Sequence, residues 1–263
     1  MISLKSAQEI EGIERAGAVV AEVLDRVSRE AGPGVSTAAL DRIAEDLIRA
    51  TEGATPAFKG LYGFPATLCT SINEEVVHGI PSADRVLEAG DILSVDVGVK
   101  LDGLYADAAV TVPIGEVTDE VRELLLCTQE ALEHGVEQAR VGARVGDIGA
   151  SVQETVEPRG YSVIRELVGH GVGHAAHEDP QVPNYGRRGH GQELREGLVI
   201  AIEPMVNVGG REIRTLEDEW TVVTADGSLS AHFEHTVAVT GQGPRVLTAR
   251  TVATAAEGKR DVG

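Results

Sequence analysis

The chain has 263 residues, of which 42% are hydrophobic, and this is enough apolar material to bury a full core. Its 23 Lys and Arg against 42 Asp and Glu give a net charge of −19, which argues against binding to nucleic acid or to an anionic membrane. Two cysteines make no disulfide framework, and neither a secretory leader nor an apolar run of membrane-spanning length is evident, so we expect a cytoplasmic protein.

The N-terminal part of the chain carries the pattern of two amphipathic helices. Apolar residues at helical spacing predict a helix that begins near Ser6 and stops at Gly32-Pro33-Gly34. A second helix follows, with Ser36 or Thr37 as its cap. Each helix has one apolar face, which we expect to be buried.

The segment Ile92–Val112 alternates like a β-hairpin that turns at residues 100–103. If the two ends of this turn pair, Asp96 lies directly opposite Asp107. At an effective dielectric constant near 20, two charges about 4 Å apart repel each other by roughly 4 kcal/mol. Protonation of one acid or a cation between the two would relieve this repulsion, and a metal becomes the stronger interpretation if more ligands exist elsewhere.

The order of helices and strands occurs twice. A second helix pair follows the hairpin, the first member capped by Thr118 and the other opening after Gly142. Leu87–Asp96 also resembles Leu194–Glu203, with an acidic residue at the same end. The alternative is that any strand entered from a turn shows a glycine followed by apolar residues. We expect one domain over residues 1–250, with two similar halves over about 6–112 and 118–240, and a flexible tail over 251–263.

Two more acidic residues lie in apolar surroundings. Glu203 ends an apolar run and precedes Pro204, which suits a strand end beside a site. Glu234 lies inside Ala231–Thr240, which alternates as a strand, and a carboxylate there is costly unless it is paired or coordinated. Either acid alone has the ordinary interpretation of a hydrogen-bonded buried side chain.

The glycine-rich segment Gly169–Glu178 supplies histidines, of which His170 is the candidate ligand. Four carboxylates and one imidazole form a hard, oxygen-rich set of ligands. Such a set suits Mn²⁺, Fe²⁺ or Co²⁺ at least as well as Zn²⁺, and it suits two ions about 3.5–4 Å apart. A lone buried Asp or His needs no metal, but five such residues together predict one.

Two long motifs, Cys69–Pro81 and Gly169–Tyr185, resemble those of the type I methionine aminopeptidases. Asp96, Asp107, Glu203-Pro204 and Glu234-His235-Thr236 match the same family in order and spacing, and the resemblance extends from about Ser6 to Val246. It implies the pita-bread fold, an α/β (α+β) architecture in which two pseudo-symmetric halves form a central curved antiparallel sheet flanked by helices.

The resemblance also implies two divalent metal ions, which could be Co, Mn, Fe or Zn. In the family pattern, Asp107 and Glu234 bridge the two ions, Asp96 chelates one, and His170 and Glu203 complete the other. Water activated by the metals would attack the first peptide bond, with Glu203 carrying its proton as general base and then acid.

Further roles follow from the same resemblance. His177 would steady the scissile carbonyl or the developing oxyanion, His78 would contact the peptide nitrogen, and Asp96 would meet the free amine of the substrate. The residues expected around the methionine side chain are Phe58, Leu61, Tyr62, Phe64, Cys69 and Trp220. A monovalent cation is also possible near Asn73 and Ser230.

The chain departs from the family pattern at three positions. His174 and Ala176 stand where the family usually has an Arg and a bulky aromatic residue, and His232 stands where a Gln is common. Ala176 predicts a roomier pocket and a broader side-chain preference. For His174, His190, His232 and His235 we expect solvent exposure or local hydrogen bonds.

The expected activity is removal of the initiator methionine from nascent chains, favoured when the second residue is small. The expected partner is the N-terminal peptide of a nascent polypeptide, met in transient proximity to the ribosome by a monomer. One alternative is a broader-specificity or X-Pro aminopeptidase of the same fold. Another is a binding protein without catalysis, but such relatives generally lose ligands, whereas all five are present here.

Overall fold

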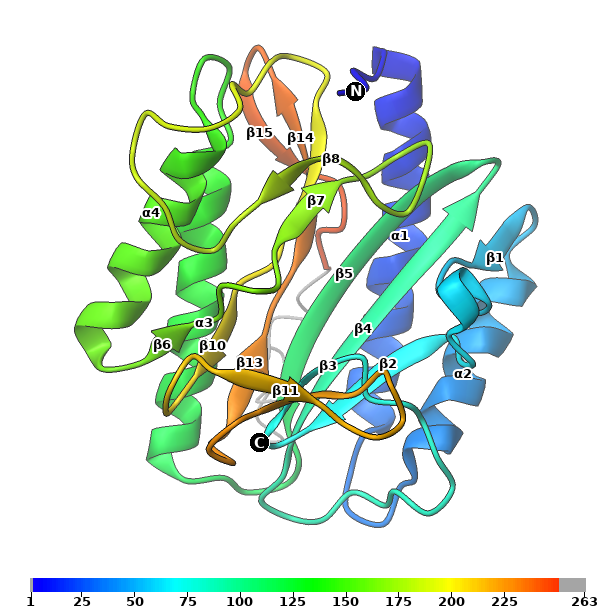
Figure 1. Cartoon of the computed structure of the whole chain (residues 1–263). Helices are drawn as coiled ribbons and strands as arrows, with labels where there is room; N and C mark the ends of the chain where they lie inside the picture. Colours follow the sequence, from blue (N-terminus) through cyan, green and yellow to red (C-terminus); the bar gives the residue numbers. More distant parts are fainter. Residues whose placement is uncertain (1, 251–263) are drawn as a thin grey trace, which may run out of the picture.

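Two helix pairs flank the strands of the molecule, which a computed structural model describes over residues 2–250. In one pair, α1 (Ala7–Glu30) packs beside α2 (Thr37–Ala50), and in the other α3 (Asp119–Glu137) packs beside α4 (Val145–Val156), with strands between the pairs (Figure 1). The flexible tail expected over 251–263 falls outside the described residues.

The helix starts follow from local capping. The Ser6 side chain accepts a hydrogen bond from the Glu9 backbone, and the Glu9 carboxylate accepts one from the Ser6 backbone, which confirms the predicted start of α1. Thr118 caps α3 through the backbone N–H of Val121, as predicted. Ser36 is the N-cap residue of α2, although its side chain makes no capping hydrogen bond.

The β4–β5 hairpin has a different register from the predicted one. Strands β4 (Ile92–Leu101) and β5 (Leu104–Pro113) are joined by Asp102-Gly103 alone, with φ of +51° and +90°, a backbone that suits a tight type I′ turn. Asp107 therefore pairs with Gly98, and Asp96 pairs with Ala109. The predicted direct opposition of the two acids is wrong by two positions, but a shift of two keeps both on one face as diagonal neighbours.

The strand pairs within residues 2–250 are antiparallel and form four sheets. The first sheet holds β1 (Ala54–Pro56), β4, β2 (Leu68–Ile72) and β5, and the second holds β15 (Gly243–Val246), β14 (His235–Thr240), β9 (Val199–Ile202), β7 (Gly169–Gly171) and β8 (Glu178–Val182). The other two sheets are β13 (Ser230–His232), β10 (Met205–Asn207) and β6 (Ser162–Val163), and β11 (Ile213–Thr215), β12 (Val222–Thr224) and β3 (Glu75–Val77). Two short 3-10 helices cover Leu61–Gly63 and Glu157–Arg159. This mixed α/β architecture with antiparallel sheets confirms the predicted fold class.

The strands are interrupted at two acidic residues. Glu203 lies between β9 and β10, as its apolar run and Pro204 predicted. The prediction of one continuous strand over 231–240 is wrong at Glu234, because β13 ends before this residue and β14 begins after it. The Glu234 N–H leaves the β14 ladder and donates to the Ala109 carbonyl of β5 (3.0 Å). Both carboxylates are thereby brought beside the hairpin.

Equivalent backbone hydrogen bonds occur just before the second helix of each pair. Gly34 N donates to Leu87 O (2.8 Å), and Gly142 N donates to Leu194 O (2.9 Å). Both glycines have φ of +87°, a backbone conformation that disfavours other residues. Equivalent turns therefore connect one helix pair to the segment before β4 and the other helix pair to the segment before β9.

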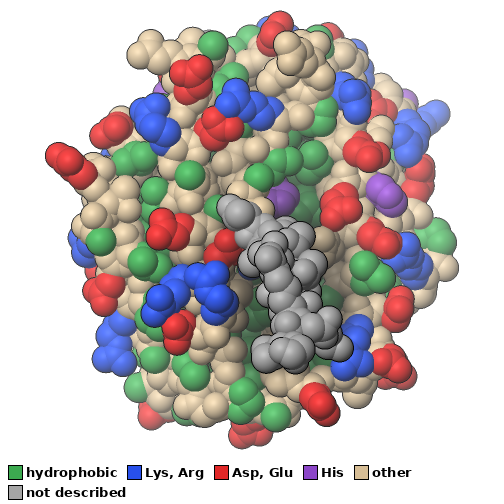
Figure 2. Space-filling model, turned by 180° about the vertical axis from the view of Figure 1, so that it is seen from behind, with side chains coloured by type: hydrophobic (Ala, Val, Ile, Leu, Met, Phe, Trp, Pro, Cys, Tyr) green, Lys and Arg blue, Asp and Glu red, His purple; other side chains and the backbone are tan. Residues whose placement is uncertain are grey.

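One large aliphatic core joins the two halves of the chain, with α1 packed on the hairpin and α3 packed near β13 and β15. On the face seen in Figure 2, acidic and basic side chains are interspersed, so the excess of acid is spread over that surface. Within residues 2–250, no helix has the length and apolar character needed to span a membrane.

Candidate metal centre and active site

A cavity of about 280 Å³ collects the residues predicted for the site. The predicted ligands and polar residues that line it are Asp96, Asp107, His170, Glu203, Glu234, His78 and His177, and the predicted apolar wall residues are Phe58, Leu61, Tyr62, Phe64, Cys69 and Trp220. Residues that the sequence did not indicate also line it: Val77, Leu167, Val168, Met205 and His232. These side chains come from both halves of the chain.

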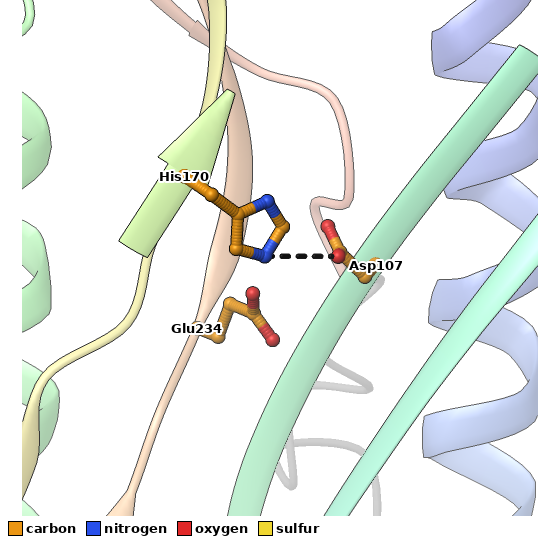
Figure 3. Close-up of side chains that lie close together, drawn as sticks. All are labelled: Asp107, His170 and Glu234. Carbon is orange, nitrogen blue, oxygen red and sulfur yellow. Dashed lines mark ion pairs between the residues drawn. The ribbon is translucent and has the colours of Figure 1, made fainter. Parts of the chain in front are cut away.

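Three side chains converge at the base of the cavity. Asp107 comes from β5, His170 from β7, and Glu234 from the break before β14 (Figure 3). One ligand atom from each lies within 4.8 Å of those of the other two. Asp107 and Glu234 are each only 3% exposed, so their charges are removed from water. Such a buried group of acids needs a compensating cation or bound protons.

The His170 ring is oriented as a ligand. Its Nδ1 lies 2.9 Å from the Gly171 carbonyl oxygen, and a carbonyl can only accept, so Nδ1 carries the proton and Nε2 presents its lone pair. Nε2 lies 3.6 Å from Asp107 Oδ2 and 3.5 Å from Glu203 Oε1. These separations exceed a hydrogen bond. They match the separation between two ligand atoms of one metal ion, which is about 3.4 Å in a tetrahedral site.

Within the part of the chain that the structure describes, Asp96, Glu203 and Glu234 all carry carboxylates that lack a compensating positive charge. Asp96 Oδ1 is buried and has no hydrogen-bond partner among residues 2–250. Burial and the neighbouring Asp107 raise the pKa of Asp96 well above its usual range. Burial raises the pKa values of Glu203 and Glu234 as well, with further contributions from the surrounding acids. An unpartnered carboxylate oxygen among closely spaced acids fits divalent cations, which would supply the missing positive charge.

Thr236 fixes Asp107 from behind. Its hydroxyl lies 2.8 Å from Asp107 O and 2.9 Å from Asp107 Oδ1, and the Asp107 N–H donates to the same hydroxyl (3.1 Å). Because Thr236 is fully buried on β14, it couples the hairpin to the second sheet. This contact sets the direction in which the Asp107 carboxylate points.

Two further histidines stand beside the acids. The His177 ring packs edge-on against His170, with 4.5 Å between centroids. His78 has φ of +60°, and the following Gly79 packs so tightly that a Cβ there would lie 2.2 Å from Thr70 O. Burial lowers the pKa values of both rings, and a neighbouring histidine lowers each further. Both imidazoles are therefore neutral near pH 7 and can donate one hydrogen bond.

Apolar side chains form the opposite wall of the cavity. Phe64 and Trp220 meet edge to face at 5.1 Å, and Cys69 pairs with Asp96 across β2 and β4. Burial and the nearby Asp96 raise the pKa of the Cys69 thiol well above its usual value, so it stays neutral. Gly98 makes room here, because a Cβ would lie 2.6 Å from Phe58 Cε1. An apolar pocket therefore adjoins the acids.

The prediction for His232 is wrong. It is only 2% exposed, and neither ring nitrogen has a hydrogen-bond partner within the described chain. Burial lowers the pKa of His232 to about 3. Its position two residues before Glu234 was the available signal, because alternate residues of an extended segment share one face.

The other three histidines make local hydrogen bonds, as expected. His174 Nε2 lies 2.8 Å from Glu9 Oε1, His190 Nδ1 lies 3.1 Å from Arg188 O, and His235 Nδ1 lies 2.9 Å from Thr248 Oγ1. Ala176 is buried, and its effect on the side-chain preference of the pocket stays a prediction.

Asn73 and Ser230 lie together, as the expected monovalent-cation site requires. Ser230 N donates to Asn73 O (3.0 Å), and Ser230 Oγ has no hydrogen-bond partner in the range 2–250. The cation itself stays a prediction.

Lys5 holds the segment that carries His177. Its side chain is fully buried and donates to Glu178 Oε2 (2.5 Å), while Glu178 Oε1 accepts hydrogen bonds from the backbone of His174 and Ala175. We expect Lys5→Met to lower the free energy of unfolding by about 3–5 kcal/mol, because a buried carboxylate loses its partner. Urea denaturation would measure this loss.

The exposed ion pair between Arg188 and Glu154 provides the matched control. Arg188→Met should change the unfolding midpoint little, because solvent screens an exposed pair. Equal midpoints for the Lys5 and Arg188 variants would contradict a structural role for the buried pair.

Residues 11–241 match the model of metallopeptidase family M24. A methionine aminopeptidase of Clostridium acetobutylicum is 54% identical over 248 residues, which cover 94% of this chain and 99% of that protein. Methionine aminopeptidase 1 of Bacillus subtilis is 48% identical over 248 residues, with 94% and 99% covered.

Solved structures agree with the sequence comparisons. The crystal structure of methionine aminopeptidase from Thermotoga maritima matches with a TM-score of 0.93 at 46% identity, and covers 95% of this chain and 100% of that chain. A prolidase from Pyrococcus horikoshii matches with a TM-score of 0.76 at 24% identity, over 94% of this chain and 63% of that chain, which shows a shared fold. These neighbours confirm the pita-bread fold. The chain therefore belongs to metallopeptidase family M24 and, within it, to the methionine aminopeptidases.

Proposed function

We propose that this protein is a metal-dependent exopeptidase that removes the N-terminal methionine from newly made proteins. The observation that carries the proposal is the convergence of two buried carboxylates, two partly buried carboxylates and one imidazole beside an apolar pocket. The relatives named methionine aminopeptidase, at 48–54% identity over nearly the whole chain, support the same activity.

The ligand set supports two divalent cations. Asp107 and Glu234 would be shared by both ions, Asp96 would bind one, and His170 with Glu203 would complete the other. When bound, two such ions polarise a carbonyl group and lower the pKa of water toward about 7. The oxygen-rich set is compatible with Co, Mn, Fe or Zn.

The chain's own residues supply proton transfer and orientation. Glu203 would take the proton from the attacking water and deliver it to the departing amine nitrogen. His177 would donate to the scissile carbonyl oxygen, and His78 would contact the peptide nitrogen. The Asp96 carboxylate would face the free amine, which limits cleavage to the first residue.

The apolar wall supports recognition of an unbranched, sulfur-containing side chain. Phe64 and Cys69 belong to a buried apolar cluster, and the partly buried Phe58 and Trp220 pack against it. Tyr62 is 78% exposed and stacks over His177 at 6.0 Å between ring centroids, while Leu61 also lines the cavity. This rim would meet the residues that follow methionine and would favour a small second residue.

The organisation of the chain is part of the proposal. Residues 1–250 would form one catalytic domain of two duplicated halves, and the equivalent hydrogen bonds of Gly34 and Gly142 support the duplication. We expect a cytoplasmic monomer that meets nascent polypeptides close to the ribosome.

A peptide panel tests this function directly. Metal-loaded protein is expected to release methionine from Met-Ala-Ser at least about tenfold faster than from a peptide with a bulky second residue, measured by liquid chromatography. Because the polar groups face the N-terminal amine, an acetylated peptide should remain intact and serves as the control.

Other outcomes would favour the alternatives. Faster cleavage of X-Pro peptides than of Met-Ala-Ser would identify a prolyl-directed relative of the same fold. Intact Met-Ala-Ser, with no divalent metal found by elemental analysis, would contradict the proposal and favour a binding protein.

A further inference from the structure

We propose that His232 is a positioning residue that hydrogen-bonds the second carboxylate oxygen of Glu203 during turnover. This inference rests on the proposed function, because it assigns a partner to the residue that would move the proton. It begins from a buried imidazole that no part of the described chain satisfies.

The backbone of His232 is firmly held. His232 N donates to Thr111 Oγ1 (2.8 Å), the Thr111 hydroxyl donates back to His232 O (2.8 Å), and Ser94 Oγ lies 2.8 Å from the same hydroxyl. His232 also pairs with Met205 in β10. The ladder and the Thr111 contacts therefore fix the backbone from which the ring projects.

The ring is polar and enclosed, yet it lacks partners. Its side chain is 2% exposed, and both Nδ1 and Nε2 are without hydrogen bonds within residues 2–250. Leaving buried polar atoms unpaired is costly, so such atoms in native proteins usually serve a ligand, a water or a neighbour that moves toward them. The ring lines the same cavity as His78 and Glu203.

The two oxygens of Glu203 face different histidines. Oε1 lies 3.5 Å from His170 Nε2, on the side of the acids, and Oε2 lies 3.9 Å from His232 Nε2. The backbone of Glu203 is anchored, because Asn184 Nδ2 donates to its carbonyl oxygen (3.0 Å). A side-chain movement of about 1 Å would bring Oε2 within hydrogen-bond distance of His232.

This contact would select one orientation of the Glu203 carboxylate. With Oε2 held by His232, Oε1 stays directed at the His170 side of the site, where the ion and the reacting water would lie, and the side chain need not search for its reactive rotamer. A group of this kind affects the rate of the chemical step more than substrate binding. Its loss should therefore lower kcat and leave KM nearly unchanged.

Two variants separate positioning from packing. His232→Leu fills similar space without a hydrogen-bond donor, and His232→Gln keeps one. We expect kcat on Met-Ala-Ser to fall by about 10- to 100-fold in the Leu variant and by less than about fivefold in the Gln variant, with KM within twofold in both. His190→Leu, which removes an exposed ring, serves as the control and should behave as the unchanged protein.

Stability gives a readout that does not depend on activity. Because leucine removes two unpaired buried nitrogens, the melting temperature of metal-free His232→Leu should rise by about 2–4 °C. A slower but more stable variant cannot be explained by poor folding.

The outcomes distinguish this inference from the proposed function. If the unchanged protein does not cleave Met-Ala-Ser, the proposed function fails. If it cleaves but His232→Leu is equally fast, or His232→Gln is as slow as His232→Leu, positioning by His232 is overturned. Lower metal content in the Leu variant, or a fall in its melting temperature, would overturn it too, since these results would assign the ring to metal retention or to packing.

Discussion

Asp96→Asn is expected to lower kcat/KM by about 10³-fold or more and, at the same time, to raise the melting temperature of the metal-free protein. Asp96 is buried beside Asp107, and its Oδ1 has no hydrogen-bond partner in the described part of the chain. An amide removes the charge that would hold a cation and the substrate amine, so catalysis is lost. It also removes repulsion from the unloaded site, so folding is favoured.

The measurements are peptide cleavage, bound metal by elemental analysis, and thermal unfolding after chelation. Asp102→Asn is the matched control, because it makes the same change at the exposed turn of the same hairpin, where asparagine is well tolerated. We expect Asp96→Ala and Glu203→Ala to abolish turnover as well. Near-normal rates in any of these three variants would refute the assigned roles.

The contribution of Asp96, Glu203 and Glu234 to the stability of the metal-free protein is expected to fall as the pH rises from about 4 toward 7, whereas the buried histidines, whose pKa values are lowered, contribute the opposite trend. Burial first, and neighbouring acids second, raise the pKa values of Asp96, Glu203 and Glu234. In the unfolded chain these groups lose their protons near pH 4, whereas the folded protein retains them. The folded state then binds more protons, so stability is complete below the unfolded pKa and is lost as the pH rises, by about 1.4 kcal/mol per pH unit for each retained proton.

Divalent cations should reverse this trend. Ions bind the deprotonated carboxylates, so saturating Mn²⁺ should stabilise the protein more at pH 7 than at pH 5. Urea denaturation at both pH values, with chelator or with Mn²⁺, measures the four free energies. In the metal-free series Asp96→Asn should gain stability relative to the unchanged protein as the pH rises, because the histidines contribute equally to both proteins and only the Asp96 contribution is removed. A metal-free protein whose stability rises over this pH range by as much as the metal-loaded protein would contradict a cluster of buried acids.

Local sequence was sufficient for several elements. The capping box of Ser6 and Glu9 uses groups three residues apart, so the start of α1 depends on neighbours alone. The alternation of residues 92–112 likewise placed Asp96 and Asp107 on one face of a hairpin. The acids and histidines that line the cavity were largely predictable because such residues are rare in apolar segments, and because the motifs resemble a known family.

Sequence reasoning failed where a position depended on distant segments. The two-residue turn at Asp102-Gly103 lies one residue later than predicted, which moved Asp107 from opposite Asp96 to opposite Gly98. The break at Glu234 arises because its N–H bonds to β5. The burial of His232 depends on Thr111, far away in the chain, and no local pattern reports such a partner.

The amino-acid sequence by itself determined the types of group that this protein brings to its site and the face of each strand from which they project, because both follow from chemistry and from the two-residue period of extended chain. Only the tertiary structure decided how far apart those groups lie, which oxygens remain unpartnered and which histidine enters the cavity. Those properties depend on strand register and on contacts between β5, β7, β13 and β14, and such contacts form only when segments remote in sequence pack together.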